Sequence, residues 1–162
     1  MKYYLCLGSN SGDRSKNLNA ALIHMQQRGL RILSCSSLYE TEPVGIPSET
    51  WFFNQVVEVD TDMRPFELLA WVKATEKKMG RVLPEKLRSR VIDMDILLAE
   101  DRVIQTDKLH IPHPKITMRN FVLIPLTEIA PDIIHPILNK KIRDLLLESE
   151  DSHQVKIINI SR

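Results

Sequence analysis

The chain has 162 residues, 43% of them hydrophobic and 27% charged, which suits one domain with a proper core. Its 22 basic and 21 acidic residues nearly cancel, and this balance argues against bulk binding of nucleic acid. No stretch approaches the roughly 18 apolar residues of a membrane span, and the N-terminal run is too short for a signal peptide, so we expect a cytoplasmic protein with no membrane partner.

The first half of the chain predicts three extended segments and one helix. Residues 2–8 predict a strand, and residues 18–29 show helical spacing of apolar side chains until a glycine stops the helix. Residues 30–40 predict a second extended segment. Residues 41–50 hold two prolines and a glycine and predict a loop, and residues 53–60 predict a third strand.

The second half begins with a helix that Pro65 opens and Gly80 closes. Residues 81–89 predict a loop, and residues 90–100 predict a fourth strand. Short helical or irregular pieces around three prolines follow, and residues 139–148 predict a C-terminal helix.

This order of elements, strand–helix–strand–strand–helix–strand, is a split βαβ pattern. It predicts the α+β class and a ferredoxin-like βαββαβ sandwich, with an antiparallel sheet that carries helices on one face. No repeat, low-complexity tract or linker interrupts the pattern, so we expect a single domain over residues 1–162.

Two aspartates lie inside the apolar run RSRVIDMDILL of residues 88–98. On a strand, Asp93 and Asp95 share one face with Cα atoms about 6–7 Å apart, while the apolar residues beside them take the other face. Neighbouring carboxylates repel, and a divalent cation removes that cost. Hard oxygen ligands favour Mg²⁺, which also binds substrate phosphates. The alternative is a solvated polar face of an edge strand.

The segment before this strand is strongly basic. Seven basic and two acidic residues lie between Lys73 and Arg90. A nucleoside triphosphate with Mg²⁺ needs this combination, because cations bind the outer phosphate oxygens while carboxylates hold the metal. The alternative is a solvated helix end and loop that carry the same charges without binding anything.

Residues 39–54, YETEPVGIPSETWFFN, join a Pro/Gly loop to aromatic side chains and Asn54. An aromatic ring stacks on a flat heterocycle and an amide recognises its edge, so this stretch is a candidate heterocycle site. The other interpretation is that Phe52 or Phe53 enters the core and Asn54 only starts a strand.

A second loop, HIPHPKITMRNF, places His110, His113, Lys115 and Arg119 around two prolines. Zinc is disfavoured, because no cysteine lies nearby and the histidine spacing alone defines no site. A phosphate or ribose contact and a purely structural imidazole are both open for His113.

Together these segments resemble one family, 6-hydroxymethyl-7,8-dihydropterin pyrophosphokinase of folate biosynthesis. The resemblance lies in LGSN with Gly12-Asp13, YETEPVG, FFNQVV, Glu76 to Arg81, RVIDMDILL, IPHP, RNFVLIPLTEIAP and His135-Pro136. These motifs follow in order from residue 7 to residue 136. Their combination is specific to the family, although no single piece is.

The resemblance implies a three-layer form of the ferredoxin-like sandwich and a Mg²⁺-dependent diphosphokinase. In this family ATP donates its β,γ-diphosphoryl group to the hydroxymethyl group of the pterin, and AMP leaves. Asp93 and Asp95 match the family's two aspartates, which hold two Mg²⁺ ions that come with ATP. The partners are ATP and 6-hydroxymethyl-7,8-dihydropterin, with no nucleic acid, and we expect a monomer or weak dimer.

Three sets of residues match functional positions of the family. The catalytic set comprises Arg81, Arg90 and Asp95, of which Asp95 is the candidate general base. The pterin set comprises Thr41, Glu42, Pro43, Val44, Phe52, Asn54 and Phe121. The ATP set comprises Glu76, Arg81, Arg90, Ile96, His113 and Arg119, together with His110 and with Lys73 and Lys108, which occupy places where other members vary.

One loop departs from the family. Many members carry Trp-Gly-Pro before the second arginine, where this chain has Leu87, Arg88 and Ser89. Leucine cannot stack as an indole does, and loss of the Gly-Pro pair changes loop stiffness, so lid closure and nucleotide affinity should differ. Trp51 is a candidate to compensate from across the pocket.

Two rival functions remain. The first is a catalytically idle ferredoxin-like module that binds a nucleotide or RNA, and the second is a scaffold with a decayed site. A sheet that binds RNA presents exposed aromatic residues, whereas this chain places an acidic pair there. The retained aspartates, arginines and Asn54 count against decay.

Overall fold

The structure is a computed structural model that describes residues 1–45, 49–80 and 90–158. In chain order its elements are β1 (Lys2–Ser9), α1 (Arg14–Gln27), β2 (Arg31–Cys35), β3 (Tyr39–Thr41), β4 (Phe52–Asp60), α2 (Pro65–Lys78), β5 (Asp93–Ala99), β6 (Ile104–Gln105), β7 (His110–Ile111), the 3-10 helix η1 (Ile116–Met118), α3 (Asn120–Ile129), β8 (Ile134–His135), β9 (Lys140–Lys141), α4 (Ile142–Leu147) and β10 (Val155–Ile157). Within these ranges, no helix has the length and apolar character needed to span a bilayer.

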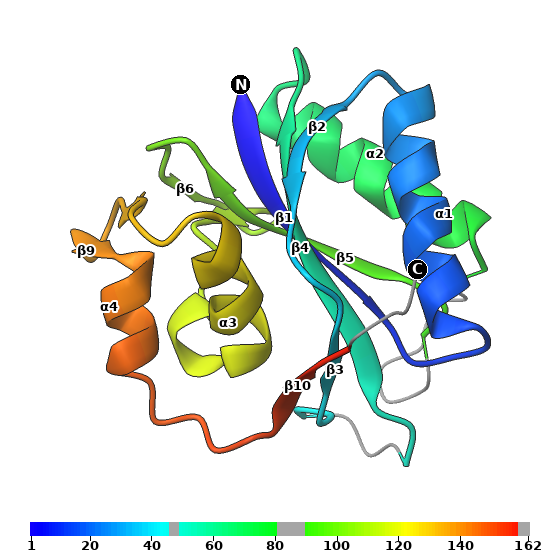
Figure 1. Cartoon of the computed structure of the whole chain (residues 1–162). Coiled ribbons are helices and arrows are strands. Elements are labelled where there is room, and N and C mark those ends of the chain that lie inside the picture. Colours follow the sequence, from blue (N-terminus) through cyan, green and yellow to red (C-terminus); the bar gives the residue numbers. More distant parts are fainter. Residues whose placement is uncertain (46–48, 81–89, 159–162) are drawn as a thin grey trace.

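The main sheet is antiparallel, and β1 and β4 form its centre (Figure 1). β5 pairs with the free side of β1, while β2 and β3 pair with successive parts of β4. β10 adds to the outer side of β3, so that the strands follow the order β10-β3-β4-β1-β5. The predicted α+β class with an antiparallel sheet is confirmed.

The extended segment predicted over residues 30–40 is two strands rather than one. At the break, the Ser36 amide donates to the Val56 carbonyl over 2.8 Å, and the Ser36 hydroxyl accepts from the Val56 amide over 2.9 Å. A serine side chain therefore replaces a main-chain group of the ladder. This substitution separates β2 from β3 while both strands stay beside β4.

Helices cover both faces of the sheet, and the prediction of one covered face was wrong. α1 and α2 lie on one side, and α3 and α4 lie on the other (Figure 1). The reason is visible in β1, which is buried along all but its first residue. Leu5 and Leu7 belong to the apolar cluster under α1 and α2, while Tyr4 and Cys6 belong to the cluster under α3 and α4. Strands that are buried on both faces have continuous rather than alternating apolar sequences.

The C-terminal elements also differ from the prediction. The helix expected over residues 139–148 is α4, which begins only at Ile142 because Lys140–Lys141 pairs with β8 as β9. α3 was expected only as short or irregular pieces, since Pro125 lies inside it. Proline usually breaks a helix, but here the apolar face of α3 is buried and keeps the helix together.

Candidate active site

The two aspartates of β5 lie on one face of the strand, as predicted. Asp93 is opposite Gly8 and Asp95 is opposite Cys6 in the pairing of β5 with β1. The intervening Met94 is 3% exposed and belongs to the core, whereas both carboxylates line a hollow. The pair therefore faces a cavity instead of an open solvated surface.

This hollow has a volume of about 230 Å³. It is lined by Cys6, Gly8, Thr41, Glu42, Val44, Gly45, Phe52, Asn54, Arg90, Asp93, Asp95, Lys115, Arg119 and Phe121. Sites for drug-sized ligands occupy about 300–1,000 Å³, so this volume suits a compact bicyclic heterocycle better than a whole nucleotide. Residues from both the pterin set and the catalytic set thus meet in one place.

Asn54 is fixed at the floor of the hollow. Its side chain is buried, and its Nδ2 donates to Thr41 Oγ1 over 2.6 Å. Gly8 is paired with Asn54 across β1 and β4, and a Cβ atom at position 8 would stand 2.5 Å from Asn54 Oδ1. Only glycine at position 8 leaves the amide in this place.

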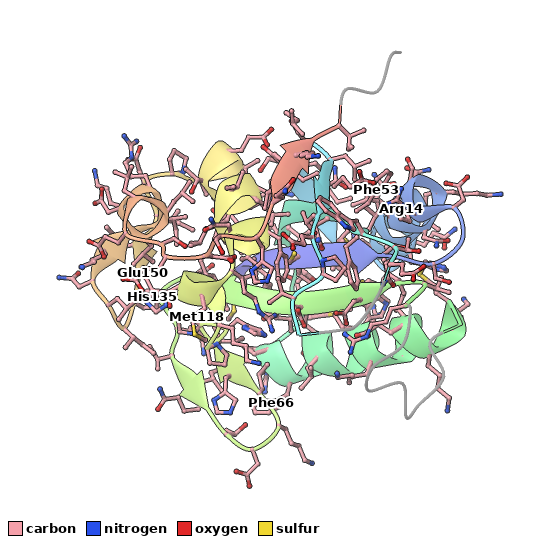
Figure 2. The ribbon with its side chains drawn as sticks, turned by 90° about the horizontal axis from the view of Figure 1, so that it is seen from below. Arg14, Phe53, Phe66, Met118, His135 and Glu150 are labelled. Carbon is pink, nitrogen blue, oxygen red and sulfur yellow. The ribbon has the colours of Figure 1, made fainter. Side chains whose placement is uncertain are left out.

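Two aromatic rings contribute to the walls. Phe52 comes from β4 and Phe121 from α3, and the Arg119 guanidinium lies 5.4 Å from the centre of the Phe121 ring. Phe53 is not among the residues that line this hollow and packs against Arg14, whose guanidinium is 3.8 Å from the ring centre (Figure 2). Of the two neighbouring phenylalanines, Phe52 is therefore the one available to a heterocycle.

The carboxylate pair is electrostatically uneven. Asp93 Oδ2 accepts a hydrogen bond from Arg90 Nη1 over 3.0 Å. Burial raises the pKa of Asp95, and the Asp93 carboxylate raises it further, to about 7, against the lowering effect of Arg119. At neutral pH, the charged form of Asp95 is therefore disfavoured in the folded protein when no cation is bound.

Arg90 is held by the N-terminal LGSN motif. Its amide donates to Asn10 Oδ1 over 2.6 Å, and the Asn10 amide donates to the Arg90 carbonyl over 3.0 Å. Arg90 Nε is buried and has no hydrogen-bond partner within residues 1–45, 49–80 and 90–158. A buried donor without a protein partner is typical of a place where a ligand binds.

Three residues of the ATP set lie near the pair without lining the hollow, and a fourth, His110, acts on one of them. Lys73 and Glu76 project from α2, and both charges act on the pKa of Asp95. His113 donates its amide to the Leu97 carbonyl over 2.9 Å. Burial lowers the pKa of His113 to about 4, with contributions from Arg119 and Lys115, so the imidazole is neutral at neutral pH. The exposed His110 acts on the same imidazole.

Other predicted residues are placed elsewhere or not described. Ile96 is buried in the core, and Lys108 is exposed in the turn between β6 and β7. Pro43 lies outside the lining of the hollow, and Trp51 lines a separate hollow with Arg14, so the compensation by Trp51 stays a prediction. Arg81 and the whole loop of residues 81–89 lie outside the described residues.

Four lining residues were not predicted as part of the site: Cys6, Gly8, Gly45 and Lys115. Cys6 and Gly8 reach it because β1 lies between β4 and β5, and no local motif encodes that pairing. Burial, with Asp95 and Asp93 nearby, raises the pKa of the Cys6 thiol and keeps it protonated. Lys115 was visible in the basic His–Pro loop, where its charge was a usable signal.

The donor set fits Mg²⁺ better than a transition metal. Within the described parts of the chain, no group of three or more His, Cys, Asp or Glu side chains is arranged to hold a metal ion. Mg²⁺ is commonly held by one or two carboxylates, with water and substrate phosphates as the remaining ligands. Asp93 and Asp95 provide such a carboxylate pair.

Comparison with known proteins adds to this geometry. The sequence pattern of the family described as 7,8-dihydro-6-hydroxymethylpterin-pyrophosphokinase (HPPK) matches residues 4–131.

The chain belongs to the HPPK family.

Two similar relatives are both named 2-amino-4-hydroxy-6-hydroxymethyldihydropteridine pyrophosphokinase. The protein of Aquifex aeolicus is 40% identical over 146 residues, which are 90% of this chain and 91% of that protein. The protein of Bacillus subtilis is 41% identical over 132 residues, which are 80% of this chain and 78% of that protein. These two HPPK relatives therefore match along most of their own length.

Longer HPPK relatives also occur. Folic acid synthesis protein FOL1 of Dictyostelium discoideum is 40% identical over 136 residues, and the chain spans only about a fifth (20%) of its length. Among solved structures, wild-type HPPK-DHPS of Plasmodium falciparum with pteroate has a TM-score of 0.74 at 18% identity. The structural similarity covers 91% of this chain and 44% of the Plasmodium chain, and it shows a shared fold.

Proposed function

We propose that this chain transfers the β,γ-diphosphoryl group of ATP to the hydroxymethyl group of 6-hydroxymethyl-7,8-dihydropterin, releasing AMP, as a step of folate biosynthesis. One observation carries the proposal. A single hollow joins the acidic pair of β5 to a pocket made of an amide and two aromatic rings. A flat polar heterocycle suits the pocket, and a metal-bound phosphate suits the acidic pair. The names of the HPPK relatives support the same reaction.

The pterin would occupy the end of the hollow that holds Asn54. The amide is fixed by Thr41 and cannot rotate freely, so it presents a constant pattern to a heterocycle edge. Phe52 and Phe121 come from different elements, and both rings line the hollow, where a flat heterocycle would stack on them. Such a preformed site aligns the hydroxymethyl oxygen at little entropic cost on binding.

Asp93 and Asp95 would hold two Mg²⁺ ions that arrive with ATP. Bound Mg²⁺ would neutralise the phosphate charge and remove the repulsion between the two carboxylates. A carboxylate that coordinates a cation is a weak base, so we assign Asp95 to holding the metal and not to proton transfer. Burial and the Asp93 carboxylate raise the pKa of Asp95, so a cation bound beside it would favour its charged form.

Arg90 would bind phosphate oxygens. Its Nη1 is bonded to Asp93, which orients the guanidinium toward the hollow, and its Nε has no partner within the described residues. A guanidinium binds phosphate through forked donors, and Arg119 and Lys115 add positive charge to the same hollow. The role of Arg81 rests on the sequence resemblance.

We also propose the ferredoxin-like βαββαβ arrangement in three layers for the fold. The order of β1, α1, the broken strand β2–β3, β4, α2 and β5 along the chain supports it. The placement of β1 between β4 and β5 supports it as well. The alternative function, an idle module that binds RNA, is not favoured, because the sheet face that lines the hollow carries two carboxylates.

The test is release of AMP from ATP in the presence of the pterin and Mg²⁺. We expect turnover by the unchanged protein and a loss of at least about a hundredfold in Asp93→Asn and Asp95→Asn, because metal ions supply several kcal/mol to phosphoryl transfer. Asp101→Asn removes an exposed carboxylate beyond the end of β5 and serves as the matched control. Near-normal turnover in both site variants would overturn the assignment.

A further inference from the structure

The segment that follows α4 crosses from one wall of the hollow to the other. We call residues 149–157 the C-terminal strap. It leaves the end of α4, passes below α3 and runs along β3 as β10 (Figure 1). None of its residues lines the hollow, yet it contacts elements that do.

At its first contact, the strap is bonded to the start of α3. The Asn120 amide donates to Asp151 Oδ2 over 2.8 Å, and Asn120 Nδ2 donates to the Asp151 carbonyl over 3.0 Å. Ser149 Oγ donates to Asn120 Oδ1 over 2.6 Å. Asn120 stands between Arg119 and Phe121, so these bonds fix the turn that carries two residues of the hollow.

At its second contact, the strap is bonded to the loop that forms the opposite wall. The Glu42 amide donates to the Gln154 carbonyl over 2.9 Å, and the Gln154 amide donates to Glu42 Oε2, also over 2.9 Å. The next residue, Val155, pairs with Thr41. Thr41 in turn holds Asn54, so the strap supports the floor of the hollow through one intermediate residue.

A single buried carboxylate connects the two contacts. The side chain of Asp151 is 5% exposed, and its Oδ1 accepts from the His153 amide over 3.0 Å while its Oδ2 accepts from Asn120. Burial alone would raise the pKa of Asp151, but the hydrogen bonds from Asn120 and His153 lower it overall. Asp151 is therefore charged at neutral pH, and its Oδ2 holds the strap against α3. Its Oδ1 fixes the strap itself, since both the amide and the imidazole of His153 contact that oxygen.

We propose that Asp151 is a positioning residue that sets the separation between the Phe121 wall and the Thr41–Val44 wall, and thereby the affinity for the pterin. The inference rests on the proposed function of the hollow. Asp151 acts through Asn120 on one side and through the short link to Gln154 on the other. On the phosphate side, Asp93, Asp95 and Arg90 come from β5 and the residues just before it, and no hydrogen bond joins them to the strap in the part of the chain that the structure describes. Arg119 is the one residue of that side that lies next to Asn120.

Asp151→Asn is the sharpest test, because the amide has nearly the same shape. An asparagine has one acceptor oxygen, so it cannot accept from both the Asn120 amide and the His153 amide. One of these donors then faces the NH₂ group. Ser149→Ala is a milder second variant that keeps the carboxylate and loses the hydroxyl bonded to Asn120. Glu150→Gln is the matched control, since Glu150 is the exposed neighbour in the same strap (Figure 2).

The measurement is calorimetric titration of each protein, first with a non-hydrolysable ATP analogue and Mg²⁺, and then with the pterin on that complex. In Asp151→Asn we expect the Kd for the pterin to rise about tenfold, because one charge-assisted hydrogen bond that holds the Phe121 wall is lost. The Kd for the nucleotide should stay within about twofold of the unchanged protein. Ser149→Ala should shift pterin affinity in the same direction, and Glu150→Gln should leave both constants unchanged.

Two results would overturn the inference. If Asp151→Asn and Ser149→Ala bind the pterin as the unchanged protein does, the strap is only structural. If both ligands weaken equally, the variant has loosened the whole fold and not one wall. Failure of the unchanged protein to bind pterin at all would instead defeat the proposed function, so the two failures are distinguishable.

Discussion

At the scale of single residues, the site depends on Gly8 as much as on any charged group. The Asn54 amide occupies space that any side chain at position 8 would need. A steric requirement of this kind comes from the pairing of β1 with β4. This requirement explains why Gly8, which has no side chain to bind a ligand, belongs to the binding site.

Gly8→Ala should displace the Asn54 amide and weaken pterin binding by about tenfold or more. The reason is that the displaced amide can no longer align its hydrogen bonds with the edge of the pterin. Titration of the pterin on the complex with a nucleotide analogue and Mg²⁺ checks this. Gly29→Ala is the control, since Gly29 has a φ of 90° and open space around its Cβ position. That variant should lose about 1 kcal/mol of stability and keep its pterin affinity. Unchanged affinity in Gly8→Ala would contradict the steric argument.

The two aspartates should respond to substitution with opposite signs when no ligand is bound. Asp95→Asn should stabilise the protein by about 1–2 kcal/mol, because burial and Asp93 penalise the Asp95 carboxylate. Asp93→Asn should destabilise it by about 1–3 kcal/mol, because the half-buried Arg90 loses its anionic partner. Urea unfolding at pH 8 without Mg²⁺ measures both free energies of unfolding. If both variants are stabilised, or both are destabilised, the two carboxylates do not differ in the predicted way.

Residue patterns alone predicted much of this chemistry. The alternation around Asp93 and Asp95 placed both carboxylates on one face, and the aromatic–amide stretch pointed to Asn54 without choosing between Phe52 and Phe53. Cys6 and Gly8 could not be found in the same way, because their place depends on strand pairing between distant segments. Roles assigned to Lys108 and Ile96 came from the resemblance, and their side chains lie away from the hollow.

At the scale of elements, α3 is fastened to the edge of the sheet near its C-terminal end. Glu128 accepts hydrogen bonds from the amide and hydroxyl of Ser37 and from the Tyr39 hydroxyl. Ser37 lies in the break between β2 and β3, so its amide is available to a helix side chain instead of a strand. The break therefore gives α3 a point of attachment.

Glu128→Gln should cost about 1 kcal/mol at pH 7, at the low end for a charged acceptor because the residue is exposed. Burial raises the pKa of Glu128, but the bonds from Ser37 and Tyr39 lower it overall. A lowered folded pKa means that the contribution is complete above the unfolded value and disappears as pH falls through the folded one. Unfolding of both proteins from pH 7 to pH 3 should show the difference shrinking. A difference that is constant with pH would contradict this account.

Local patterns predicted β1, β4, β5, α1 and α2 with small errors at their ends. α3 was not predicted, because Pro125 is a local signal against a helix and only packing against the sheet overrides it. The division of β2 from β3 depends on one serine hydroxyl, which no periodicity encodes.

At the scale of the whole molecule, ligand binding should be coupled to stability through the metal. A non-hydrolysable ATP analogue at about 100 times its Kd, with Mg²⁺, should add about 2.7 kcal/mol. For a chain of this size that corresponds to a rise in Tm of roughly 5–10 °C. Differential scanning fluorimetry should show the rise, and EDTA should remove it. A rise that persists in EDTA would show that the carboxylate pair is not a metal site.

The covering of β3 by β10 has a further effect on how the protein behaves in solution. An uncovered strand edge offers its main-chain groups to any neighbouring molecule and invites sheet growth between chains. Here three residues of β10 satisfy that edge, and its central residue is an exposed lysine, whose charge discourages a second chain from adding on. The same short strand that steadies one wall of the hollow thus protects this side of the sheet from aggregation.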